Sequence, residues 1–316
     1  MKTIPVAACG DDWVNPQEVE QMIAGTNPGE AVVLDLRSEG PSLHALGVVS
    51  AVTNWCQQHG IDHRAVTVTN WSNSVEAVPF QRSNQHLLSH FFWLSEQYQY
   101  SAPETRTGQY LFGYFVGRRT VPRCVILQQV QQNFASKFLL SMMSTVADFK
   151  FYSLDPLETW ADPEQFYHWW NSVSIPSLDR CAVRDQYQGQ IDTNASLLSL
   201  CYHVFDIELA AETYTHGNVF FPTEKTVRPI VGNKSLLVYG PQNYLARLRD
   251  LGFRTWHDIW DEGYDQFTGV ERWQRMQLVI ADLCTRDQTQ LWQQCLAVTQ
   301  HNRTHLDQLV AKYKPL

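Results

Sequence analysis

The sequence lacks long apolar runs and paired metal ligands. None of its apolar stretches reaches the ~20 residues that a membrane-spanning helix needs. The run at residues 4–8 is too short for a signal sequence, which predicts a cytoplasmic protein without a membrane span. Seven cysteines occur without CxxC or Cys/His ligand spacing, which indicates a reducing compartment and no structural zinc.

Several catalytic motifs are also missing. The chain has no Walker loop, no GxSxG elbow, no HExxH pair and no GxGxxG turn, so the ATPase, serine hydrolase, zinc protease and nicotinamide dehydrogenase classes have no support. The chain also has no Asp-x-Asp motif. We therefore expect no metal site and no required cofactor.

Positive charge is scarce. The chain has 24 Lys and Arg against 32 Asp and Glu, a formal net charge of −8. Binding of DNA depends on cations that neutralise phosphates, so a broad nucleic-acid-binding face is disfavoured and a local basic groove remains open.

What the chain does contain is a repeated alternation of strand-like and helix-like segments. Strands are expected at residues 3–9, 31–36, 65–69, 109–116, 203–211, 235–239 and 253–256, with helices between them and two helices over 269–314. The polar, turn-rich segment 101–108 suits a linker. This pattern predicts an α/β protein with an N-terminal Rossmann-like domain at 1–105, a second at 106–316, and a helical C-terminus.

The stretch 212–240 is the main candidate for function. Pro222 and Gly232 bracket a short helix between two predicted strands, and Thr223, Glu224 and Lys225 occupy its first turn. Unpaired N–H groups and Lys225 there would attract a diphosphate, and Glu224 could accept hydrogen bonds from sugar hydroxyls. The pattern indicates a nucleotide-sugar site. The competing interpretation is that Glu224 is an ordinary partner of the helix dipole.

A second cluster follows the strand at 109–116. Gly117 ends that strand, and Arg118, Arg119 and Arg123 surround the next helix start at Pro122. A guanidinium group can bind a pyrophosphate through two parallel hydrogen bonds. Arg118 and Arg123 are therefore predicted to contact the diphosphate of the nucleotide-sugar, which is the sugar donor. A solvated basic patch is the alternative.

These residues carry a resemblance. Glu212, the loop 213–221, Thr223-Glu224-Lys225 and a strand ending at Gly240 resemble the donor motif of α-1,3-fucosyltransferases and exostosin-like glycosyltransferases. The string FFPTEKTxRPI, with LGFxT and WDExYD downstream, is similar to uncharacterised bacteriophage-encoded proteins. The resemblance implies a GT-B-like fold, two Rossmann-like domains facing a cleft, with the Glu-Lys pair on nucleotide ribose and phosphate. The predicted donor set is Glu212, Thr223, Glu224, Lys225, Arg228, Gly117, Arg118 and Arg123.

The catalytic base is expected in the first domain. Glu39 follows the predicted strand 31–36, where it could take a proton from an acceptor hydroxyl. The competing interpretation is a helix cap, a common role of Ser and Glu at a helix entry. His44 and the pair Asp11 and Asp12 are alternatives. The resemblance to phage proteins implies DNA with hydroxymethylated pyrimidines as acceptor, in the host cytoplasm. A surface glycan, a small molecule, or a non-catalytic nucleotide- or sugar-binding role stay open, as do the sugar and the stereochemistry.

Overall fold

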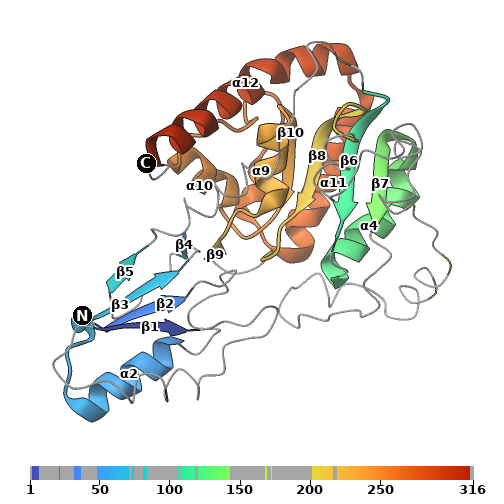
Figure 1. The fold of residues 1–316 in the computed structure, drawn as a ribbon. Helices are drawn as coiled ribbons and strands as arrows, with labels where there is room; N and C mark the ends of the chain where they lie inside the picture. The colour runs from blue at the N-terminus through green and yellow to red at the C-terminus, as the bar shows by residue number, and fades with distance from the viewer. Residues whose placement is uncertain are drawn as a thin grey trace, which may run out of the picture. The chain divides into compact units, whose positions relative to one another are not determined.

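The computed structural model describes residues 2–6, 21, 32–36, 48–70, 73–74, 81–83, 106, 108–117, 120–142, 168, 172, 201–215 and 219–313. Close contacts divide the chain into two compact units (Figure 1). Unit 1 comprises Met1–Trp93 and Gly217–Phe221, and unit 2 comprises Leu94–His216 and Pro222–Leu316. The expected boundary after residue 105 therefore lies inside unit 2.

Unit 1 is built on a parallel sheet with the strand order β1-β2-β3-β5. These strands are Lys2–Val6, Val32–Leu36, Val66–Asn70 and Gln81–Ser83. Helix α2 (Val48–His59) buries Val48, Ala51, Val52 and Trp55, a three- and four-residue spacing that forms one apolar stripe. The short 3₁₀ helix η1 (His63–Ala65) leads into β3. Strand β9 (Val219–Phe220) pairs antiparallel with β4 (Asn73–Ser74).

Unit 2 contains a second parallel sheet, ordered β10-β8-β6-β7. Its strands are β6 (Tyr110–Val116), β7 (Phe138–Met142), β8 (Phe205–Ala211) and β10 (Ser235–Tyr239). Every residue of β8 and β10 is buried, as expected for strands of a parallel sheet covered on both faces. The parallel sheets confirm the α/β class, and the predicted strands at 109–116, 203–211 and 235–239 are confirmed within two residues.

Two crossover connections start at the two central strands of this sheet and run toward its opposite edges. Helix α4 (Val121–Phe134) connects β6 to β7, and α9 (Glu224–Val231) connects β8 to β10. Glu208 of β8 accepts a hydrogen bond from α9, and Tyr114 of β6 donates one to α4. Tyr114 is in register with Leu209 of β8, so these two side chains share one face of the sheet. The neighbouring residue Glu208 points to the other face, because side chains alternate along a strand. The two helices therefore cover opposite faces, as right-handed crossovers require.

The helical C-terminus is confirmed. Helices α10 (Tyr244–Asp250), α11 (Gly269–Thr285) and α12 (Gln288–Tyr313) follow β10, with the short 3₁₀ helix η4 (Gly263–Gln266) before α11. Trp273 and Gln277 of α11 both donate to Gln129 of α4, at 2.9 Å and 2.6 Å, so α11 packs on the α4 face. Helix α12 contacts α9 and β10 on the other face. None of the helices in the described ranges is long and apolar enough to span a membrane.

The strand expected at residues 253–256 is wrong. These residues have an irregular backbone although Phe253 and Trp256 are buried. The side chain of Asn302, on α12, bonds the backbone of Arg254 on both groups, accepting from its N–H at 2.7 Å and donating to its carbonyl at 2.8 Å. One amide side chain thus takes the hydrogen bonds that a neighbouring strand would otherwise make.

Asn302→Ala should lower the free energy of unfolding by about 2 kcal/mol, because two largely buried hydrogen bonds worth ~1 kcal/mol each are lost. Urea denaturation measures this. Gln294→Ala, at an exposed position of the same helix, is the control and should change the value by less than about 0.5 kcal/mol. Equal effects of the two substitutions would contradict the role given to Asn302.

Candidate functional site

The candidate site lies where β6 and β8 end. Neighbouring parallel strands whose crossovers leave in opposite directions open a crevice beyond their carboxyl ends, which is where ligands bind in open α/β sheets. Both following helices, α4 and α9, have their N-termini at this edge. The positive ends of two helix dipoles thus converge beyond the same two strands.

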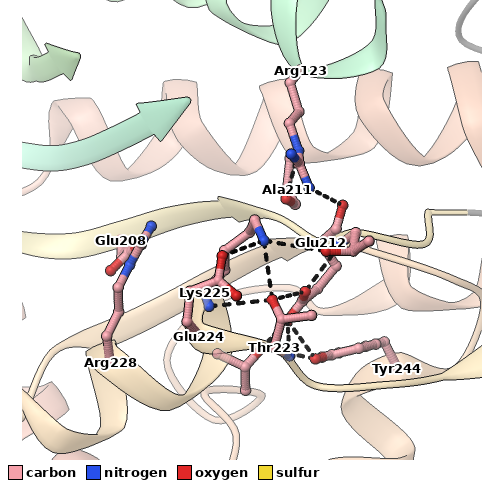
Figure 2. A network of polar contacts seen from close by, with 11 residues as sticks. Arg123, Glu208, Ala211, Glu212, Thr223, Glu224, Lys225, Arg228 and Tyr244 are labelled. Atoms are coloured by element: carbon pink, nitrogen blue, oxygen red, sulfur yellow. Dashed lines mark hydrogen bonds and ion pairs between the residues drawn. The ribbon is translucent and has the colours of Figure 1, made fainter. Parts of the chain in front are cut away.

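Glu212 lies at this edge, and its carboxylate accepts hydrogen bonds from several residues around it (Figure 2). It follows β8, is 1% exposed, and its carboxylate accepts from the N–H of Thr223 at 3.1 Å and from the Thr223 hydroxyl at 2.6 Å. The same carboxylate accepts from Thr226 at 2.6 Å and from Tyr244 at 2.9 Å. Glu212 therefore fixes the start of α9 instead of pointing toward solvent.

The α9 N-terminus begins slightly later than the sequence predicts, after a cap residue that the sequence analysis placed inside the first turn. Thr223 is the cap residue, and its hydroxyl accepts from the N–H of Lys225 at 3.4 Å. Pro222, which the sequence predicts at the first helical position, lies one residue before the cap. Gly232 ends the helix at the predicted place, and a side chain there would collide with the Tyr202 ring.

Lys225 and Glu224 form an ion pair at this helix start. The ammonium of Lys225 donates to Glu224 at 2.6 Å, to the hydroxyl of Thr223 at 3.1 Å and to that of Thr213 at 3.3 Å. Three acceptors match the three donors of an ammonium group. The Lys225 side chain is 9% exposed and that of Glu224 is 35% exposed. The carboxylate is thus the more accessible partner of the pair.

The pKa values of this pair follow from burial and neighbouring charge. Burial tends to raise the pKa of Glu224, but the cations of Lys225 and Arg228 outweigh it and bring that pKa below its usual range. Burial lowers the pKa of Lys225, an effect that Glu224 partly offsets. Glu224 is therefore ionised at neutral pH and available as a hydrogen-bond acceptor.

Arg123 reaches this edge from the opposite face of the sheet. It lies in the first turn of α4, is 5% exposed, and donates to the carbonyls of Ala211 at 3.2 Å and Glu212 at 3.1 Å. Its charge acts on both Glu224 and Lys225. The structure therefore brings Arg123 together with the Thr-Glu-Lys turn, two segments about 100 residues apart in sequence.

Arg228, predicted in the donor set, is paired with Glu208 of β8. Its guanidinium donates to Glu208 at 2.7 Å through Nε and forms a second, shorter bond through Nη2. Glu208 is fully buried and also accepts from the Tyr202 hydroxyl. Burial raises the pKa of Glu208, and Arg228 opposes that rise. This contact is structural, and a donor contact by Arg228 stays a prediction.

The charges of this cluster balance. Its three cations are Arg123, Lys225 and Arg228, and its three carboxylates are Glu208, Glu212 and Glu224. A ligand that brings only negative charge would meet cations already occupied by protein acceptors. A ligand that draws Lys225 toward itself weakens the hydrogen bond between Lys225 and Glu224. The ligand can compensate for that loss by donating hydrogen bonds of its own to Glu224.

The remaining predicted residues fall in two groups. Gly117 is described and follows the last residue of β6, at the same strand end as Arg123. Arg118 and the proposed base Glu39 lie outside the described residues, as do Asp11, Asp12, His44 and Arg119.

Two site residues escaped the sequence analysis. Tyr244 starts α10, in a segment that carries no motif, and its contact with Glu212 joins residues 32 positions apart. Glu208 had a usable signal, because an acidic residue inside the apolar strand at 205–211 must find a buried partner.

Neither metal ligands among the described residues nor similar proteins point to a function for this site. Within the described parts of the chain, no group of three or more His, Cys, Asp or Glu side chains is placed to hold a metal ion. Compared with known proteins, the chain matches no family model and no curated protein sequence.

Proposed function

We propose that this chain is a glycosyltransferase that binds a nucleotide-sugar at the carboxyl end of the unit 2 sheet. The observation that carries the proposal is the convergence of Arg123 and the Thr223-Glu224-Lys225 turn on one strand edge, from helices on opposite faces. Such an edge is the usual ligand position of this sheet type. Lys225 and two helix N-termini would bind the diphosphate. Glu224 would accept hydrogen bonds from the ribose or sugar hydroxyls.

The chemistry assigned to these groups is stabilisation of the leaving group. Negative charge grows on the nucleoside diphosphate as the bond to the sugar breaks, and preorganised cations and N–H groups lower that barrier. The base that deprotonates the acceptor would come from unit 1, with Glu39 as first candidate. In this proposal the two units form a GT-B-like pair, with donor on unit 2 and acceptor on unit 1.

The acceptor we propose is DNA that carries hydroxymethylated pyrimidines, on the basis of the resemblance to phage proteins. A base flipped out of the duplex would present its hydroxymethyl group to the donor sugar. The net charge of −8 favours instead a surface glycan or a small molecule. Mass spectrometry of hydroxymethylated DNA after incubation with mixed nucleotide-sugars decides between these acceptors. We expect the mass of the DNA to increase by one hexose or a similar sugar unit. If the DNA mass does not change while the enzyme hydrolyses the donor, a glycan or a small molecule is the acceptor.

A non-catalytic nucleotide- or sugar-binding protein is the second candidate. The pairing of charges among the described residues favours it, because Lys225 and Arg228 each already face a carboxylate of the protein. Incubation with a panel of nucleotide-sugars separates the two functions. A transferase releases nucleoside diphosphate slowly by transfer to water, whereas a binding protein leaves the donor intact over the same period.

Glu224→Gln should weaken ribonucleotide-sugar binding about tenfold and leave 2′-deoxyribonucleotide binding nearly unchanged, because a charged acceptor for ribose hydroxyls is lost. Titration calorimetry measures both affinities. Since the pKa of Glu224 lies below its usual range, wild-type affinity should stay constant as the pH falls from 7 to about 5.

The matched control is Glu271→Gln, which alters an exposed glutamate in the first turn of α11 and should change neither affinity. Equal losses for ribo- and deoxyribonucleotides would show that Glu224 does not contact the ribose.

A further inference from the structure

Tyr244, Thr226 and Glu212 form a triangle of close polar contacts beneath the candidate site. Thr226 donates to Glu212 Oε1 at 2.6 Å, Tyr244 donates to the same oxygen at 2.9 Å, and the two hydroxyls lie 2.7 Å apart. We call these three residues, together with Thr223, the glutamate clasp. All four are at most 2% exposed. A network this deeply buried is costly unless each member is satisfied, so its geometry is narrowly set.

The clasp joins elements that the local sequence does not connect. Glu212 follows β8, Thr223 and Thr226 belong to the start of α9, and Tyr244 is the first residue of α10 after β10. The backbone N–H of Glu212 also donates to the carbonyl of Tyr239 at 2.9 Å, so the ends of β8 and β10 stay paired up to the clasp. Tyr244 therefore ties α10 to the α9 N-terminus.

The clasp also fixes the polarity of the Thr223 hydroxyl. That hydroxyl has one proton, which it donates to Glu212 Oε2 at 2.6 Å. Its lone pairs then face outward and accept from the ammonium of Lys225 at 3.1 Å and from the Lys225 N–H. Figure 2 shows this sequence of contacts from Tyr244 through Glu212 and Thr223 to Lys225.

Tyr244 remains a donor in this arrangement. Burial first, and the charge of Glu212 second, raise the pKa of its phenol well above the ordinary value. The hydroxyl is therefore protonated throughout the physiological pH range.

We propose that Tyr244 is a positioning residue of the unit 2 site: with Thr226 it orients the Glu212 carboxylate, which orients Thr223, which holds the Lys225 ammonium at the α9 N-terminus. Tyr244 itself touches no ligand. The consequence for ligand binding rests on the proposed function, but the consequence for Lys225 does not.

The test uses the full chain and two shape-conserving variants, Tyr244→Phe and Thr226→Val. In protein labelled with ¹⁵N-lysine, the ammonium of Lys225 should give a slowly exchanging NMR signal near pH 6, assigned by its loss in Lys225→Arg. Both variants should speed its hydrogen exchange at least about tenfold, because Thr223 is no longer fixed as its acceptor. Nucleotide-sugar affinity should fall about tenfold in parallel.

Two controls separate positioning from general stability. Tyr264→Phe removes a hydroxyl that is as deeply buried as that of Tyr244 but does not belong to the glutamate clasp, and should leave the Lys225 signal unchanged. Lys234, a second buried lysine at the amino end of β10, provides an internal signal that the clasp variants should not affect.

The outcomes are distinct. Faster exchange at Lys225 alone, with Lys234 and Tyr264→Phe unaffected, supports the proposal. Unchanged exchange in both Tyr244→Phe and Thr226→Val overturns it. If the wild type binds no nucleotide-sugar but the Lys225 exchange still responds to Tyr244→Phe, the proposed function fails and the positioning role of Tyr244 stands.

Discussion

Lys225→Met is expected to weaken binding of nucleotide-diphosphate sugars about 100-fold. The substitution keeps the length of the side chain and removes a charge-assisted hydrogen bond to phosphate, worth up to about 3 kcal/mol. It also leaves Glu224 without its direct cation, so the remaining carboxylate repels the diphosphate. Titration calorimetry with uridine- and guanosine-diphosphate sugars measures the change.

The matched control for this experiment is Lys234→Met. Lys234 is 6% exposed, close to the 7% of Lys225, but it precedes β10 and so lies at the amino end of the sheet. Its loss should leave affinity unchanged. If Lys225→Met binds donors as the wild type does, Lys225 is not a phosphate ligand and its three protein contacts are its whole role.

Arg272→Met is expected to lower the free energy of unfolding by about 3–5 kcal/mol, the cost of breaking a buried ion pair on one side. Arg272 is fully buried in α11 and donates to Asp265 Oδ1 at 3.0 Å. It also donates to the carbonyls of Val238 at 3.1 Å and Pro241 at 3.2 Å. The substitution leaves the Asp265 carboxylate, which caps α10 through the N–H of Leu245, without its cation.

Arg275→Met, three residues along the same helix, is the control. Arg275 is exposed and pairs with Glu271 in an i,i+4 contact, so its loss should cost less than about 0.5 kcal/mol. Urea denaturation compares the two variants. Adding Asp265→Asn to Arg272→Met should recover part of the stability, because the unpaired buried charge is removed. Equal losses at positions 272 and 275 would show that the buried network contributes little.

Local signals predicted the elements of unit 2 well. Adjacent residues specify the strands at 203–211 and 235–239 and the short helix that ends at Gly232. The local signals are apolar alternation, a proline near the helix start and a glycine at its end. The same signals failed at 253–256. There the partner of the backbone is the Asn302 side chain, almost 50 residues away, which no periodicity in the segment encodes.

The amino-acid sequence by itself determined the α/β class, the helical C-terminus, and the placing of Thr223, Glu224 and Lys225 at a helix start, because hydrophobic period and capping are short-range properties. The tertiary structure decided the strand order β10-β8-β6-β7, which sends α4 and α9 to opposite faces and brings Arg123 to Glu212. It also decided that Glu212 and Arg228 point inward to buried partners. Pairing across long separations depends on which surfaces bury together, and burial is a property of the whole fold.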